Sequence, residues 1–141
     1  MIQNYFLKIE SLIYSHPIVK EVLNIEREII DSNRGWFKAK LVVNDHELHV
    51  FEFVAITKGR SHILKYGYHL QTESGSLVVR WDNAEHYREI ETFPYHVHIT
   101  DEKNVRTSGP MNLELAFERI SEILQKIKTE GEERIQEMEE N

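Results

Sequence analysis

The apolar positions of this chain recur with two different periods, and the longer period occurs at both ends. Across residues 2–14, apolar side chains return every three to four positions, which is typical of a helix with one buried face. The His16-Pro17 pair ends this pattern. A second stripe with the same spacing begins after Asn112, a residue well suited to cap a helix. We therefore predict an N-terminal and a C-terminal helix.

Between the two helices, the pattern changes to the alternation of apolar and polar positions that is typical of strands. The predicted strands are 36–43, 47–57, 61–72, 76–82 and 93–100, with the second half of 18–31 as a further strand. Short polar turns join most of them, so consecutive strands should pair as antiparallel neighbours. The predicted fold is α+β, a five- to six-stranded antiparallel meander sheet with the N-terminal and C-terminal helices packed on one face.

The same alternation divides the strand residues between an apolar and a polar face of the sheet. The polar face is expected to carry Lys65, His69, Gln71, Arg80, Asp82, His96 and His98. Lys38 and Lys40 join this group if the strand 36–43 is divided in the same way. Glu52 interrupts an apolar strand opposite Phe51 and Phe53, so its carboxylate is expected on the polar face near Lys65. We expect the functional site on this face.

Length and composition narrow the class of protein. With 141 residues, 40% of them hydrophobic, the chain fits one domain spanning 1–141, whose acidic end at 132–141 should fray or extend as a solvated helix. It has no apolar run long enough for a membrane span and no secretion signal, so we expect a cytoplasmic protein. The absence of cysteine excludes disulfides and thiolate ligands, and leaves imidazole and carboxylate as metal ligands.

The formal charge of −7 argues against nucleic-acid binding, but the charge is unevenly distributed along the chain. Residues 112–141 hold four basic residues against nine glutamates, which leaves only −2 for the rest of the chain. A locally positive polar face is therefore compatible with the acidic total.

Four segments carry an unusual density of aromatic, histidine and charged residues. They are F-E-F-V at 51–54, K-Y-G-Y-H at 65–69, R-W-D-N-A-E-H at 80–86 and T-F-P-Y-H-V-H at 92–98. In this order and at this spacing they resemble the TumE-like family of small prokaryotic toxins from toxin-antitoxin modules. The resemblance covers nearly the whole chain. It implies a growth-inhibiting toxin encoded beside a cognate antitoxin, commonly a helix-turn-helix DNA-binding protein that neutralises the toxin by direct contact.

The family pattern falls on eleven positions of this chain: Tyr66, Tyr68, His69, Arg80, Trp81, Asp82, Asn83, His86, Pro94, His96 and His98. The chain departs from the pattern at Gly67, where relatives carry a small hydroxyl residue, so no hydroxyl chemistry is expected there. The acidic last helix could bind a basic antitoxin or a second copy of the chain, which would make a homo-oligomer.

Three interpretations of the polar face remain open, and the first is metal-independent RNA cleavage without any cofactor. In this reaction a ribose 2′-hydroxyl attacks its own phosphate, which requires a base, an acid and a cation. Histidine can serve as base or acid near neutral pH. The acid-base candidates are His69 with His96 or His98, followed by His86. Arg80 would bind the phosphate and Asp82 would orient an imidazole or Arg80. The substrate-binding candidates are Lys38, Lys40, Lys65 and Asn83.

The second interpretation is a metal-dependent hydrolase or nuclease. His96 and His98 project in parallel from one strand, and with Asp82, His69 or His86 they could chelate zinc, manganese or iron. The third interpretation is a protein without catalytic activity, whose polar face docks a protein target or the antitoxin. Histidines flanked by tyrosine, tryptophan and arginine are typical of an interface hot spot.

Some of these residues also have a plain structural explanation. Arg80 and Asp82 could form a surface ion pair of small energetic value. Asn83 could turn the chain after its strand through its own side chain, and Trp81 continues an apolar set and is expected in the core. The structure must distinguish these roles from the chemical ones.

Overall fold

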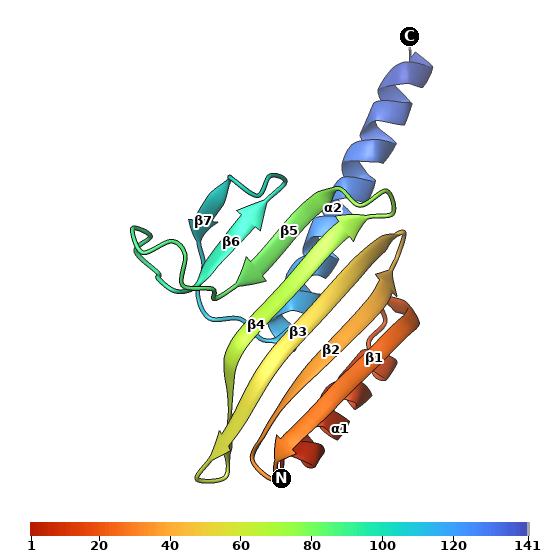
Figure 1. The fold of residues 1–141 in the computed structure, drawn as a ribbon. Helices are drawn as coiled ribbons and strands as arrows, with labels where there is room; N and C mark the ends of the chain where they lie inside the picture. Colours follow the sequence, from red (N-terminus) through yellow and green to blue (C-terminus); the bar gives the residue numbers. More distant parts are fainter. Residues whose placement is uncertain (141) are drawn as a thin grey trace.

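Seven strands form one antiparallel sheet, and two helices cover one of its faces (Figure 1). The computed structural model describes residues 1–140. The elements in chain order are α1 (Ile2–Ser15), β1 (Val19–Asp31), β2 (Arg34–Val43), β3 (His46–Thr57), β4 (Arg60–Thr72), β5 (Leu77–Asp82), β6 (His96–Ile99), β7 (Val105–Thr107) and α2 (Leu113–Glu140). Each strand pairs with its sequence neighbour. The predicted α+β class and antiparallel meander are therefore confirmed.

The number of strands is seven rather than the predicted five to six. The additional strand β7 is only three residues long and lies in the polar segment 101–110, where no alternation marks it. The strand β1 also occupies nearly the whole of 18–31 rather than its second half, because it pairs with β2 from Val19 to Asp31. In both places, pairing with a neighbouring strand decides the structure where the local pattern is weak.

The core lies between the helices and the sheet. In Figure 1 both helices lie on the same side of the sheet, with α1 beside β1 to β3 and α2 against β4. Phe6 of α1 meets Phe37 of β2 at a ring distance of 5.9 Å, and both are fully buried. On α2, Phe117 and Ile120 are fully buried in the same core. Burial of such side chains contributes about 1.5–3 kcal/mol each.

Glu52 corrects one prediction about the faces of the sheet. It was expected on the polar face, but it is fully buried on the helix-covered face, where its carboxylate accepts hydrogen bonds from the hydroxyls of Tyr5 and Tyr68, both at 2.5 Å. Phe51 and Phe53 lie on the opposite, open face. The strand β3 therefore has the reverse orientation, because two buried tyrosine hydroxyls can satisfy a carboxylate that an apolar core cannot.

The helix α2 continues past the sheet (Figure 1). Its last three turns carry the acidic segment, which is helical as far as Glu140, and Asn141 lies outside the described residues. Ile127, Ile135 and Met138 are exposed on this part of the helix. Among the described residues, no helix is both long and apolar enough to cross a membrane.

Candidate functional site

A row of cationic and imidazole residues crosses the face of the sheet that neither helix covers. The strand registers place Lys40 opposite His49, His49 opposite His69, His69 opposite Arg80, and Arg80 opposite His98. Directly opposed residues on neighbouring strands point to the same face and have Cβ atoms about 5 Å apart. Five strands, β2 to β6, thus contribute one adjacent residue each to the open face.

A second row runs beside the first and contains Lys38, Phe51, Gly67, Asp82 and His96. Because Gly67 has no side chain, this row is interrupted at β4. A groove of about 360 Å³ lies there, lined by residues of both rows that include Lys38, Lys40, His49, Phe51 and His69. The ammonium group of Lys38 lies 5.2 Å from the ring of Trp36 and 5.8 Å from that of Phe51.

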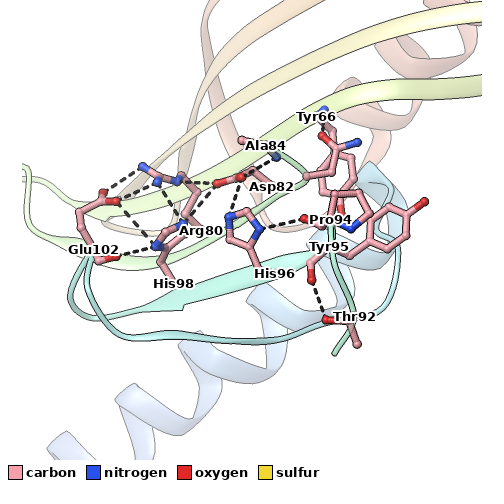
Figure 2. A network of polar contacts seen from close by, with 11 residues as sticks. Tyr66, Arg80, Asp82, Ala84, Thr92, Pro94, Tyr95, His96, His98 and Glu102 are labelled. Carbon is pink, nitrogen blue, oxygen red and sulfur yellow. Dashed lines mark hydrogen bonds and ion pairs between the residues drawn. The ribbon is translucent and has the colours of Figure 1, made fainter. Parts of the chain in front are cut away.

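Asp82 is the centre of a network of polar contacts at the β5–β6 end of the open face (Figure 2). Its Oδ1 lies 2.8 Å from Nε2 of His96, and its Oδ2 accepts a hydrogen bond from Nε of Arg80 at 3.0 Å. The same Oδ2 lies 3.4 Å from Nε2 of His98. The backbone N–H of Ala84 donates to Oδ1 at 3.0 Å and fixes the carboxylate. Asp82 therefore orients both imidazoles and the guanidinium.

Both imidazoles of this network contact backbone carbonyl oxygens through the ring nitrogen that faces away from Asp82. Nδ1 of His96 lies 2.9 Å from the carbonyl oxygen of Pro94, and Nδ1 of His98 lies 2.8 Å from that of Glu102. A carbonyl oxygen can only accept, so Nδ1 of each ring carries a proton and Nε2 is the ring nitrogen that faces Asp82. Only 2% and 1% of the two side chains are exposed. A substrate on the open face cannot contact them directly.

His69 is the half-buried imidazole of the first row. Its Nε2 lies 3.1 Å from Oε1 of Gln71, and its ring centroid is 5.8 Å from that of His49. Burial lowers the pKa of His69, and the positive charges of Arg80 and His49 lower it further, while the hydrogen bond that His69 donates to Gln71 opposes this. A lowered pKa keeps the imidazole neutral and able to accept a proton near pH 7, the requirement for a general base.

Three residues of the site were not predicted from the sequence. The carboxylate of Glu102 contacts the Arg80 guanidinium through two oxygens, at 2.9 Å from Nη1 and 2.8 Å from Nη2. The Tyr87 ring makes edge-to-face contacts with the rings of His96 and His98, with ring distances of 4.9 and 5.7 Å. His49 forms part of the first row. Glu102 and Tyr87 lie in loops without periodicity. His49 points to the same face of β3 as Phe51, so a correct orientation of β3 would have placed it in the site.

The remaining predicted site residues lie outside this network. His86 is exposed between β5 and β6, and within residues 1–140 its imidazole has no ion pair or hydrogen bond. Lys65 is exposed on the open face, opposite Phe53. Asn83 links β5 to β4, because its Oδ1 accepts from the N–H of Tyr66 and its Nδ2 donates to the carbonyl of Leu64, both at 3.0 Å. These bonds give Asn83 a structural role at the strand end.

The open face thus contains two chemically different parts. The accessible part is the row of His49, His69 and Arg80 beside the groove, where imidazole and guanidinium groups are adjacent. The buried part consists of Asp82, His96 and His98, whose ligand atoms all lie within 4.8 Å of one another and could hold a metal ion. Trp81, which is 7% exposed, lies in the core on the other face, as predicted.

The chain is similar to a known protein family. The family model described as Toxin TumE matches residues 9–135, which is most of the chain and includes every residue of both rows. No match was found among curated proteins or among solved structures.

Proposed function

Since the chain belongs to the TumE toxin family, we propose that it is the toxin of a toxin-antitoxin module and that it inhibits growth by cleaving RNA on the open face of its sheet. The observation that carries this proposal is the adjacency of His49, His69 and Arg80 on β3, β4 and β5. Two imidazoles and one guanidinium are the groups that metal-independent cleavage at a ribose 2′-hydroxyl requires.

His69 is the general base in this proposal. Its Nε2–H donates to Oε1 of Gln71, so Nδ1 carries the lone pair and has no hydrogen-bond partner among residues 1–140. Nδ1 removes the proton from the 2′-hydroxyl, whose oxygen attacks the adjacent phosphorus. The bond from phosphorus to the 5′-oxygen of the next nucleotide then breaks. The products are a 2′,3′-cyclic phosphate and a 5′-hydroxyl.

His49 is the general acid that protonates the departing 5′-oxygen. Its Nε2 lies 3.0 Å from Oε1 of Glu47, which orients the ring, and 43% of its side chain is exposed. The sequence predicted His96 or His98 as the second acid-base group beside His69, without assigning the acid and the base. We assign the step to His49 because both of the other imidazoles are buried, and a proton donor must come within hydrogen-bond reach of the leaving oxygen.

Arg80 binds the phosphate. Its Nη1 and Nη2 already contact two oxygens of Glu102, the geometry in which a guanidinium binds a phosphate through two parallel hydrogen bonds. The Glu102 side chain is 54% exposed and can be displaced by a substrate. Asp82 and His98 keep the guanidinium in place from the other side and are positioning residues. Lys38 and Lys65 form no ion pairs within residues 1–140 and can contact neighbouring phosphates.

The test is cleavage of a labelled RNA by the purified full chain in the presence of a chelator. We expect a 2′,3′-cyclic phosphate end, and we expect His69→Ala and His49→Ala to lose at least about 100-fold in rate, the usual contribution of acid-base catalysis. His62→Ala removes an exposed imidazole from the start of β4 and should cleave normally. Folding of each variant is checked by its thermal transition. Normal cleavage by folded His69→Ala would refute the assignment.

Growth after induction without the antitoxin gives a second, cellular test with the same variants. We expect the native chain and His62→Ala to arrest growth, and His69→Ala to permit it. Arrest by all three, without RNA cleavage in vitro, would refute the ribonuclease and favour a binding surface elsewhere on the molecule.

The family implies an antitoxin partner, and we propose that a basic segment of a helix-turn-helix antitoxin binds the part of α2 beyond the sheet. Residues 129–140 contain six glutamates and one arginine, and Ile135 and Met138 are 59% and 77% exposed among them. Like charges disfavour a second copy of the chain on this surface, whereas a basic amphipathic partner complements both its charge and its apolar stripe.

This contact is tested with the antitoxin encoded beside the toxin gene. Glu132→Lys combined with Glu139→Lys should weaken binding at least about tenfold and make it less dependent on salt, because attraction between opposite charges is lost. Glu73→Lys combined with Glu91→Lys makes the same charge change at exposed sites far from α2 in the sequence. Equal affinity for both double variants would exclude this surface.

A further inference from the structure

The buried cluster of Asp82, His96 and His98 has the features of a metal site, and we propose that it binds one divalent transition-metal ion, with zinc as the best match. Two imidazoles and one carboxylate are ligands that zinc, manganese and iron accept in proteins. The cluster joins the end of β5 to β6, and its three residues are buried. This inference does not depend on the proposed RNA cleavage.

The hydrogen bonds behind the imidazoles are those expected around metal ligands. A histidine that binds a metal usually donates its other ring N–H to a carboxylate or a backbone carbonyl, which fixes the tautomer and the ring orientation. His96 donates from Nδ1 to Pro94, and His98 donates from Nδ1 to Glu102. Both Nε2 atoms therefore face Asp82 and are the ring nitrogens available to a metal ion.

The distances between the ligand atoms fit a shared ion. Nε2 of His96 is 2.8 Å from Oδ1 of Asp82, and Nε2 of His98 is 3.4 Å from Oδ2. Two ligands that each lie about 2.1 Å from one ion are roughly 3.0 Å apart at an octahedral angle and roughly 3.4 Å apart at a tetrahedral angle. The two contacts involve different oxygens of Asp82, and the three ligand atoms lie within 4.8 Å of one another. Side-chain adjustments would bring all three residues to one ion, with at least one coordination position left for water.

An independent observation is the state of Nε2 on His96. This atom is buried and has no hydrogen-bond partner among residues 1–140, although Oδ1 of Asp82 is only 2.8 Å away. Buried polar atoms without a partner are rare in folded proteins. A cation between the two atoms would satisfy both.

Arg80 is the group that a metal ion would displace. Its Nε holds Oδ2 of Asp82 at 3.0 Å, and its Nη2 lies 3.2 Å from Nε2 of His98. Both of these acceptors are proposed metal ligands, so the ion and the guanidinium compete for them. Arg80 would keep its contacts to Glu102 and lose those to Asp82 and His98. Metal binding therefore tightens the β5–β6 junction and frees the inner edge of Arg80 toward the open face.

The test starts with the full native chain, stripped with a chelator and dialysed. We expect calorimetric titration with zinc to give one ion per chain, and cobalt(II) to produce the visible absorption bands of a protein-bound ion. The unfolding temperature should rise with zinc, because the ion binds the folded state, and should not respond to magnesium, which prefers oxygen ligands. If the folded native chain takes up no stoichiometric zinc or cobalt, the inference is wrong.

Substitutions locate the ion. His96→Gln and Asp82→Asn should each lower zinc affinity at least about tenfold, and His62→Ala, an exposed imidazole outside the cluster, should leave it unchanged. Full affinity in folded His96→Gln would place the ion elsewhere and overturn the assignment. If that variant does not fold, histidine NMR of the native chain decides, because zinc must shift the Nε2 signals of His96 and His98.

These outcomes are separable from those for the proposed function. Stoichiometric zinc binding without RNA cleavage would support the metal site and refute the ribonuclease. Cleavage by a chain that binds no metal would support the ribonuclease and refute the metal site.

Discussion

Glu102 and Arg80 face each other through two parallel contacts, with Oε1 at 2.9 Å from Nη1 and Oε2 at 2.8 Å from Nη2. The arginine comes from the strand β5, and the glutamate from the loop between β6 and β7. On its inner side the guanidinium is held by Asp82 and His98. The outer, exposed carboxylate therefore occupies the position where the proposed substrate phosphate would bind.

Glu102→Gln should consequently bind RNA more tightly than the native chain. The substitution removes a negative charge that competes with the phosphate for Arg80, and we expect a several-fold gain in affinity at low salt. The measurement is fluorescence anisotropy with an RNA analogue that lacks the attacking 2′-hydroxyl. Glu91→Gln makes the same change at an exposed position between β5 and β6. Unchanged or weaker binding by Glu102→Gln would show that Arg80 does not receive the phosphate.

The acidity of His69 should change when Arg80 loses its charge. Burial and the positive charges of Arg80 and His49 lower the pKa of His69, whereas Gln71 and the more distant Glu102 act in the opposite direction. In Arg80→Gln one of the lowering causes disappears, so the pKa of His69 should rise, although burial keeps part of the shift. The measurement is an NMR titration of the His69 ring. Lys65→Gln, which removes a more distant charge from the same strand, should have a much smaller effect.

A pKa of His69 that does not move in Arg80→Gln would mean that the two side chains do not interact across β4 and β5. The same titration has a consequence for activity, since a base must be deprotonated to act. On its acidic side, the native cleavage rate should therefore rise with pH through the lowered pKa of His69.

Gly67 should be replaceable by alanine but not by a large residue without loss of RNA binding. A Cβ at this position would meet no atom within 4 Å, so Gly67→Ala fits. The variant should be roughly 0.4–1 kcal/mol more stable, because alanine lowers the conformational entropy of the unfolded chain. Gly67→Phe should fold but fill the groove beside His69. The measurements are thermal unfolding and RNA affinity. Gly109→Phe, which also meets open space, controls for adding a ring. Tight binding by Gly67→Phe would exclude the groove as the binding site.

The sequence could predict most of the polar face because alternation is reliable in long strands. Lys40, His69 and Arg80 lie on the open face as the period of two requires. The strand β3 was interpreted in the reverse orientation, since Phe51 and Phe53 suggested a core face and Glu52 a polar one. A shift of one residue exchanges the faces of a strand. The same misinterpretation concealed His49, which shares the face of both phenylalanines.

The contacts of Arg80 and His98 with Glu102, and of Tyr87 with the two buried imidazoles, could not be predicted. Glu102 and Tyr87 lie in loops, and their positions depend on how the segments 83–95 and 100–104 fold over β5 and β6. Loop conformation has no periodic signal in a single sequence. The burial of His96 and His98 follows from this loop packing, which is why their accessibility could be judged only from the structure.

Glu52 should make the stability of the protein depend on pH. Burial raises the pKa of this carboxyl in the folded state, while the Tyr5 and Tyr68 hydroxyls partly oppose the shift. Its other close neighbours across the strands are Phe37 and Tyr66, which bring no charge. The folded state therefore holds the proton more tightly than the unfolded chain does. The contribution of Glu52 to the free energy of unfolding must fall as pH rises from the ordinary carboxyl pKa, about 4.3, through the higher folded value.

Glu52→Gln tests this directly, because its amide has nearly the same shape and does not ionise. Between about pH 5 and pH 8, the native chain should lose more stability than the variant does, since only the native chain must ionise a buried carboxyl. The measurement is urea unfolding of both proteins at the two pH values. Glu28→Gln, on the exposed strand β1, should keep the native pH dependence. If Glu52→Gln also keeps it, the pH dependence originates from groups other than the buried carboxyl, and Glu52 is ionised equally in the folded and unfolded states.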